Sequence, residues 1–449
     1  MKKILFILAF GLFFLASYAQ QTITPATALD AYINNGDPTY AWEVRDSYSV
    51  GKTKAYSILL ISQKWQGILW KHELIIFVPE KINHDGALLY INGGALKDGV
   101  PNYLSQDDAT SLSISAIAAK NHAITAMIRQ VPNQPLYGGM TEDELISHTF
   151  SEFFKDGDYS WPLLFPMVKS ARKAMDVVQE FSKQQTGAGI NRFVVTGFSK
   201  RGWTTWLTAA SQDQRVAAIA PMVIEMLNMP ATLTYQKEIY GEYSDQIGDY
   251  VSLDLPQAIN TEIGKAIAQM VDPYSYRTKM TMPKLIFMGT NDEYWTIDAV
   301  KHYIYDIPGQ NYLSYVPNAG HSLGDKKQAF GTLSAFFGFT LDRKAYPVCE
   351  WNLTEKGKKI TLDVKASGDQ LARAVFWSAE SDNRDFRKSL WKDKEIVSKS
   401  KSDIKETINY PKKGFSAFYI ELVYKDPKGG EYSMTTRTYV ADTKQVFVE

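Results

Sequence analysis

Three residues, Ser199, Asp292 and His321, have the side chains needed for nucleophilic catalysis. A serine hydroxyl becomes a strong nucleophile only when a base accepts its proton, and the base needs an acid that orients it. The three residues occur in the order serine, acid, histidine, as in hydrolases that place the serine on a strand-to-helix turn. Each also follows an apolar segment that is typical of a strand. The pattern predicts a Ser-His-Asp triad.

The segment around the serine, VVTGFSKRGWTTWL at residues 194–207, has the composition of a sharp turn between a strand and a helix. A nucleophile elbow requires small residues beside the serine, and Gly197 meets this requirement two positions before Ser199. Arg201 stands two positions after the serine, and a glycine, Gly202, follows only at the third position. The usual G-x-S-x-G pattern is therefore broken. The alternative is a serine that simply caps an ordinary helix.

The base and the acid of the triad each have competitors. Downstream of Ser199 the histidines are His302, inside a helix-like segment, and His321, in the loop PNAGHSLGD after a strand. Ligands of parallel sheets bind beyond the carboxyl ends of the strands. His321 is the expected base because its loop follows a strand and therefore lies at that edge. Asp292 in GTNDEYW is the expected acid, while its neighbour Glu293 and the strand-end residue Glu225 are alternatives.

Two backbone segments could stabilise a developing oxyanion. The N–H of Lys200, directly after the nucleophile, is expected to be one donor. The loop YINGGA, with Gly93, Gly94 and Ala95 after an earlier strand, is expected to supply the second. The alternative for this loop is a plain turn that needs glycine.

Several side chains near these segments are candidates for substrate binding. Lys200 and Arg201 are two cations beside the nucleophile, and Arg129 follows a strand that ends at the same edge. They could bind a substrate carboxylate or phosphate, or Arg201 could instead pair with an acidic structural partner. Glu225 is a further candidate for substrate binding. The histidines lack the spacing of a zinc site, so no metal or other cofactor is expected.

The elements that must position these residues alternate between strand and helix. Apolar strands separated by amphipathic helices predict a mostly parallel sheet with helices on both faces, as in an α/β-hydrolase, over residues 20–345. The segment 226–276 is too long for a simple connection and is expected to form a helical cap over the site. A second, partly acidic excursion spans residues 132–160. Residues 346–449 contain only strand patterns and predict a C-terminal β-sandwich of the immunoglobulin or fibronectin type.

Composition and the first residues narrow the class of protein. The 449-residue chain has 49 basic and 49 acidic residues, so no charge excess indicates nucleic acid or an anionic surface as a partner. Lysines, an apolar run and small residues over positions 1–19 predict a signal peptide, and therefore export to the periplasm or the medium. No later apolar run is long enough to span a bilayer. The single cysteine, Cys349, cannot form an internal disulfide.

Several strings, GFSKRGWTTWL, WPLLFPMVKSARKAMD, RQVPNQPL, VDPYSY and VPNAGHSL, closely resemble the PhoPQ-activated pathogenicity-related protein family (the PqaA type). The resemblance extends from about residue 42 through the C-terminal sandwich, over nearly the whole mature chain, and that family is similar to α/β-hydrolases. Matched to its pattern, Ser199 is implied as nucleophile, Asp292 as acid and His321 as base. An aromatic pair is usual after its Asp-Glu, and Tyr294 and Trp295 occupy those positions. Trp295 is a further substrate-binding candidate.

Together these features predict an exported serine hydrolase that cleaves an ester or amide bond through an acyl-enzyme intermediate. Its substrate would be a small-molecule ester or a peptide-like compound. The alternative is a secreted binding or signalling protein that uses a hydrolase scaffold with a vestigial triad, because a fold does not by itself fix a function.

Overall fold

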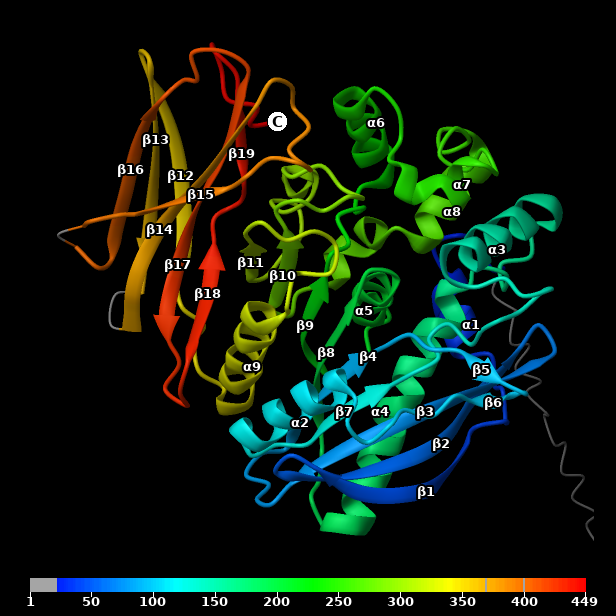
Figure 1. Ribbon diagram of the computed structural model, residues 1–449. Coiled ribbons are helices and arrows are strands. Elements are labelled where there is room, and N and C mark those ends of the chain that lie inside the picture. The colour runs from blue at the N-terminus through cyan, green and yellow to red at the C-terminus, as the bar shows by residue number, and fades with distance from the viewer. Residues whose placement is uncertain (1–21, 368–369, 399) are drawn as a thin grey trace, which may run out of the picture.

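The computed structural model describes residues 22–367, 370–398 and 400–449 (Figure 1). The predicted signal peptide lies outside this range. In the described part of the chain, fourteen strands form one twisted sheet. Its strands, in spatial order, are β1 (Ala41–Val50), β2 (Thr53–Trp65), β3 (Ile68–Pro79), β7 (Thr125–Ile128), β4 (Gly86–Ile91), β8 (Arg192–Phe198), β9 (Val216–Met222), β10 (Lys284–Gly289), β11 (Asn311–Val316), β18 (Glu431–Thr435), β17 (Phe415–Lys425), β14 (Leu371–Ser381) and β15 (Lys392–Glu395), with β19 (Tyr439–Ala441) paired to β17.

The centre of this sheet is parallel. Strands β7, β4, β8, β9, β10 and β11 pair in parallel with one another in this order, so their carboxyl ends lie at one edge. Strands β4, β7 and β10 are buried along their whole length, as expected for strands covered on both faces. Antiparallel strands extend the sheet on both sides. The fold is thus mixed α/β with a large central sheet whose middle is parallel.

Helices cover both faces of the sheet (Figure 1). One face carries α1 (Ala28–Ile33), α4 (Leu164–Thr186) and α5 (Lys200–Ala210), which share a hydrophobic core with the strands. The other face carries α2 (Ala109–Asn121) and α9 (Lys327–Asp342), which belong to a second core. Among the described residues, no helix has both the length and the apolar character needed to cross a membrane.

The insertion expected at 226–276 is helical. It contains α6 (Met229–Tyr240), η1 (Asp245–Ile247), α7 (Gly248–Val251), α8 (Glu262–Val271) and η2 (Pro273–Lys279). The other excursion, 132–160, holds α3 (Glu142–Asp156). Helices α3, α6, α7 and α8 lie together beyond the carboxyl ends of β8 to β10 (Figure 1). The 3-10 helix η3 (Ala299–His302) separates β10 from β11.

The C-terminal region consists of strands, as expected, but it does not form a separate sheet system. Strand β18 pairs with β11, at Leu313 and Thr435, so β14, β15, β17, β18 and β19 continue the central sheet. A second sheet of β12 (Cys349–Lys356), β13 (Lys359–Ala366) and β16 (Asp403–Asn409) shares a hydrophobic core with β14 and β17. The short pair β5 (Leu96–Lys97) and β6 (Val100–Pro101) lies near the first strands. The region is two-layered, and an immunoglobulin-like arrangement and a domain boundary at 346 stay predictions.

Candidate active site

Ser199 occupies the sharp turn between β8 and α5. Its backbone has φ 56° and ψ −125°, a left-handed conformation that costs a non-glycine residue on the order of 1–3 kcal/mol. The turn is held by the Ser199 N–H, which donates to the carbonyl of Met222 at 2.8 Å, and by the Ser199 carbonyl, which accepts from Trp203 at 2.9 Å. Although Ser199 precedes the helix, its side chain makes no capping hydrogen bond. The residue therefore has the backbone geometry of a nucleophile elbow, with a half-buried side chain, rather than that of a helix cap.

The glycines around the serine explain why the broken motif still forms the turn. A Cβ at Gly197 would lie 2.8 Å from the Cβ and the carbonyl oxygen of Arg201. A Cβ at Gly202 would lie 2.7 Å from the carbonyl oxygen of Met222, on the neighbouring strand. Gly202 thus provides the close approach of helix to sheet, so the position two after the serine is free to hold Arg201.

Asp292 and His321 follow β10 and β11 and are hydrogen bonded to each other. The imidazole Nδ1 lies 2.9 Å and 3.1 Å from the two carboxylate oxygens of Asp292. The ring of Tyr294 stacks on the imidazole with 4.1 Å between ring centroids, and Asp292 accepts the Tyr294 N–H at 2.8 Å. Glu293 accepts the backbone N–H of His321 at 2.9 Å. The carboxylate of Asp292 orients the ring, and the neighbouring carboxylate fixes the backbone.

The other imidazole nitrogen, Nε2, is buried and has no hydrogen-bond partner within the described part of the chain. The structure therefore does not join it to the Ser199 hydroxyl by a hydrogen bond. Catalytic hydrogen bonds are often long in the absence of substrate and tighten in the complex. An imidazole whose Nδ1 is fixed by a carboxylate and whose Nε2 is free has the arrangement of a general base.

Glu225, the alternative acid, has a different set of contacts. It is buried and accepts the hydroxyl of Tyr303 at 2.7 Å, while its other carboxyl oxygen has no partner among the described residues. Burial raises the pKa of Glu225 to about 8, and the charge of Asp292 adds to the effect. A carboxyl group that is neutral at pH 7 stabilises an imidazolium poorly, so the geometry favours Asp292 as the acid.

The two cations beside the nucleophile are paired with acidic residues of α3. Arg201 donates to both carboxylate oxygens of Glu142 at 2.7 Å, and Lys200 lies 2.9 Å from Glu142 and 3.0 Å from Asp143. The side chains of Lys200 and Arg201 are 8% and 11% exposed. Burial alone would raise the pKa of Glu142, but these cations outweigh it and hold the pKa well below its usual range. Arg201 thus has the acidic structural partner that was one of its two alternatives.

The sequence did not single out Glu142 and Asp143. Their signal was available as three consecutive acidic residues after Thr141, a composition typical of a helix start. What could not be read locally was that this helix lies against the serine turn.

The glycine loop after β4 lies beside the elbow. A Cβ at Gly93 would lie 2.7 Å from a guanidinium nitrogen of Arg201, and the Gly94 carbonyl accepts from the Gln134 side chain at 3.1 Å. Lys200 is the first residue of α5, so its N–H has no acceptor inside the helix. Which N–H groups of Gly94 and Ala95 would face an oxyanion stays a prediction.

Arg129 has acidic and backbone partners of its own, and a role in substrate binding stays a prediction. Its guanidinium is buried and donates to Glu73 at 2.8 Å and to the carbonyl of Asn102 at 2.7 Å. The structure therefore brings Lys200 and Arg201 to the elbow, while Arg129 supports the loop that follows β4. Among the described residues, no group of three or more His, Cys, Asp or Glu side chains is arranged to hold a metal ion.

A cavity of about 80 Å³ opens beside Ser199. Its lining comes from α3, α5, the segment after β9, the helical insertion and the loop after β10. Trp295 is part of this lining, and its indole N–H is buried without a partner among the described residues. Tyr294 also lines the cavity, so its ring connects the cavity to His321.

The parallel sheet, the serine turn and the Asp-His pair together define a candidate hydrolase-type site. Residues 29–387 match the model of the PhoPQ-activated pathogenicity-related protein family, and the chain belongs to that family. Autocrine proliferation repressor protein A of Dictyostelium discoideum is 29% identical over 453 residues, covering 93% of this chain and 90% of its own.

Similar solved structures include an esterase and a hydrolase. Acetyl xylan esterase 1 from Thermoanaerobacterium sp. JW/SL YS485 is 16% identical with a TM-score of 0.47, over 71% of this chain and 95% of its own. The S-formylglutathione hydrolase from Agrobacterium tumefaciens is 10% identical with a TM-score of 0.43, over 68% of this chain and all of its own.

Proposed function

We propose that the protein is a serine hydrolase that cleaves an ester or amide bond, with Ser199 as nucleophile, His321 as base and Asp292 as acid. The observation that carries this proposal is the hydrogen-bonded Asp292–His321 pair, whose Nε2 has no partner among the described residues. Tyr294 stacks on this imidazole and lines the same cavity as the strained Ser199. Backbone strain of this kind persists only where the surrounding structure enforces it, and it concentrates at functional sites.

The reaction follows from the roles of these groups. Nε2 of His321 takes the hydroxyl proton as Ser199 Oγ attacks the carbonyl carbon, and Asp292 stabilises the imidazolium that forms. The N–H of Lys200, together with an N–H from the Gly94 and Ala95 loop, stabilises the oxyanion. The imidazolium then protonates the leaving alcohol or amine, which departs from an acyl-Ser199 ester. Water, deprotonated by the same imidazole, releases the acid and restores the hydroxyl.

We also propose that the protein acts outside the cytoplasm, on the basis of the leader pattern at residues 1–19. Separation of periplasm and medium from cytoplasm in cells that express the full chain tests this. Mature protein beginning near Gln20 in an exported fraction is expected, and a full-length cytoplasmic product would contradict it.

A fluorophosphonate probe tests the proposed nucleophile. The purified protein should be labelled on Ser199, and labelling should be lost in Ser199→Ala and strongly slowed in His321→Ala. Ser47→Ala, a change at an exposed serine of β1, is the matched control and should be labelled normally. Persistent labelling of Ser199→Ala would remove this serine from its role.

The second candidate is a secreted regulatory protein with a vestigial triad, and the name of the relative from Dictyostelium favours it. The same probe separates the two proposals. A correctly folded protein that is not labelled and hydrolyses no ester or amide would support the regulatory role.

A further inference from the structure

We propose that the cavity beside Ser199 binds an apolar group of about five to eight non-hydrogen atoms, on the acyl or the leaving-group side of the bond that is cleaved. This inference rests on the proposed hydrolase function and adds the class of substrate to it.

The lining of the cavity is apolar. It includes Trp203 on α5, Ile224 and Met226 after β9, and Leu233, Leu255 and Ile259 of the helical insertion. Apolar surface binds apolar ligand surface with a free energy roughly proportional to the area removed from water. The cap therefore contributes hydrophobic walls to the site.

Three polar side chains of the lining, those of Asp143, Lys200 and Tyr250, are engaged with one another. Asp143 pairs with Lys200 at 3.0 Å and accepts the hydroxyl of Tyr250 at 3.0 Å. The indole N–H of Trp295, another lining residue, is buried and has no partner among the described residues. Hydroxyl groups of a sugar need many partners, and burying them without partners is costly. The cavity is thus suited to a hydrocarbon or aromatic group rather than to a sugar.

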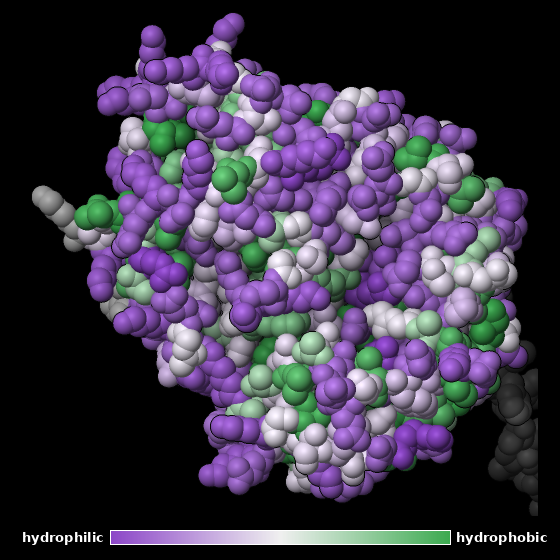
Figure 2. All heavy atoms as spheres, in the orientation of Figure 1, coloured by the Kyte–Doolittle hydropathy of each residue, from purple (hydrophilic) through white to green (hydrophobic). Residues whose placement is uncertain are grey.

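The volume limits the size of that group. With about 10–15 Å³ taken for a water-sized group, a cavity of about 80 Å³ holds on the order of five to eight such groups. A butanoyl to heptanoyl chain or a benzoyl group has this size. The face shown in Figure 2 is mostly hydrophilic, with hydrophobic residues in small separate groups. The apolar cavity contrasts with that surface.

Two series of substrates test the proposal. One is p-nitrophenyl esters with acyl chains from two to sixteen carbons, and the other is acetate esters of alcohols of increasing length. In one of the two series, kcat/KM should rise by about four-fold per added methylene until the chain fills the cavity, and it should fall for longer chains. A rise in the first series assigns the cavity to the acyl group, and a rise in the second assigns it to the leaving group.

Variants that fill the cavity provide the structural control. Leu255→Trp and Ile259→Trp should move the optimum to shorter chains, whereas Leu112→Trp, at an exposed position of α2, should not. The rate of labelling by a small fluorophosphonate reports whether each variant retains an intact serine.

The outcomes separate the two proposals. Labelling of Ser199 without any dependence on chain length, or a preference for acetylated sugars, would overturn the cavity assignment while the hydrolase proposal stands. An absence of both labelling and turnover would overturn both.

A second observation carries an independent inference about residues 386–391 of the C-terminal region, called here the 386–391 segment. The side-chain amide of Asn291, next to Asp292, donates to the carbonyls of Ser389 at 2.7 Å and Arg387 at 3.2 Å. Asn318, three residues before His321, donates to the carbonyl of Trp391 at 2.9 Å and accepts its N–H at 2.8 Å. The loop that carries Asp292 (the acid loop) and the loop that carries His321 (the base loop) are thus both hydrogen bonded to the 386–391 segment.

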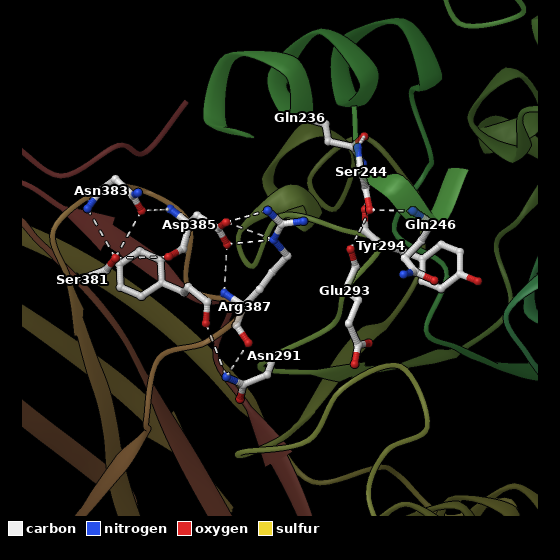
Figure 3. Close-up of polar contacts among 11 residues, drawn as sticks. Gln236, Ser244, Gln246, Asn291, Glu293, Tyr294, Ser381, Asn383, Asp385 and Arg387 are labelled. Carbon is white, nitrogen blue, oxygen red and sulfur yellow. Dashed lines mark hydrogen bonds and ion pairs between the residues drawn. The ribbon is translucent and has the colours of Figure 1, made fainter. Parts of the chain in front are cut away.

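The helical insertion holds the acid loop from the other side. The hydroxyl of Ser244 donates to the carbonyl of Glu293 at 2.7 Å, and Gln236 donates to the carbonyl of Tyr294 at 2.7 Å. Figure 3 shows Asn291 turned toward the strand-connecting loop that carries Asp385 and Arg387, whereas Glu293 and Tyr294 lie on the side of Ser244. The 386–391 segment has its own support, because Asp385 accepts from the Arg387 guanidinium at 2.6 Å and 2.9 Å.

We infer that Asn291 and Asn318 are positioning residues, through which the C-terminal region keeps Asp292 and His321 in register. Displacing a catalytic group by about 1 Å can cost on the order of 100-fold in rate. Asn291→Ala and Asn318→Ala should therefore lower kcat by about 10- to 100-fold with little change in KM. They should also slow labelling of Ser199 by a similar factor.

Arg373→Ala is the matched control, because it removes an exposed ion pair with Glu431 in the same region without touching either loop. Its kcat and labelling rate should match those of the unaltered protein. Unchanged kcat in both asparagine variants would overturn the inference. A loss that appears in KM alone would also overturn it, since a misplaced triad changes the chemical step.

Discussion

Replacing Asp292 by asparagine should separate the three carboxylates that could serve as the acid. The side chain of Asp292 is 7% exposed and that of His321 is 20% exposed, so the charges interact in a partly desolvated site. Two unit charges about 4 Å apart at an effective dielectric constant of about 20 interact by about 4 kcal/mol. Asparagine keeps an oxygen for the Tyr294 N–H but removes the charge that stabilises the imidazolium. We expect kcat for p-nitrophenyl butanoate to fall by about 1,000-fold.

Glu293→Gln and Glu225→Gln are the matched comparisons for this assay. Gln at 293 can still accept the His321 N–H, and Glu225 is already neutral at pH 7 because its pKa is raised to about 8. Glu293→Gln replaces an exposed carboxylate acceptor by an amide acceptor, and Glu225→Gln removes no charge at pH 7, so kcat should fall by no more than about ten-fold in either variant. A larger loss in either variant than in Asp292→Asn would refute the assignment of the acid. So would an Asp292→Asn variant that keeps activity within ten-fold of the unaltered protein.

Further predictions concern stability. The free energy of unfolding in urea should be about 1 kcal/mol higher for Ser199→Gly than for Ser199→Ala, because glycine relieves the backbone strain at φ 56°. Equal stability of the two variants would contradict a strained turn. Glu142→Ala should lower the free energy of unfolding in urea by about 2–3 kcal/mol, because it leaves Arg201 buried without its partner; the 39% exposure of Glu142 reduces this cost. Glu43→Ala, at an exposed ion pair, should cause no measurable change. Equal effects of the two changes would contradict a stabilising role for the Glu142–Arg201 pair. Because the pKa of Glu225 is raised to about 8, this residue contributes most to folding stability below about pH 4.5, and its contribution falls as the pH rises toward 8. The stability of Glu225→Gln relative to the unaltered protein should therefore increase across that range. A stability difference that does not change with pH would contradict a neutral buried carboxyl group.

Much of the candidate site follows from local sequence, because its residues lie at the ends of strands. Apolar runs before Ser199, Asp292 and His321 identify buried parallel strands, and parallel strands bring their carboxyl ends to one edge. Glycine spacing marks the turn even where the motif departs from its usual form. The pairing of Asp292 with His321 was predicted on this basis, and the structure contains it.

Contacts between distant segments could not be read in the same way. Nothing local to Thr435 indicates that its strand joins Leu313 and continues the central sheet. The position of Glu142 against Arg201 likewise depends on how the excursion folds back over the elbow. Both are long-range contacts, which follow from the packing of whole elements rather than from periodicity.

The covalent intermediate gives the most direct test of the account. The protein is mixed with a p-nitrophenyl ester of an acyl chain of four to eight carbons, quenched in acid, and digested for mass spectrometry. We predict an acyl adduct on the peptide that contains Ser199. More of this adduct should accumulate when hydrolysis of the acyl-Ser199 ester is slowed. Turnover accompanied by an adduct on another residue, or turnover by the Ser199→Ala variant at the rate of the unaltered protein, would contradict the central claim.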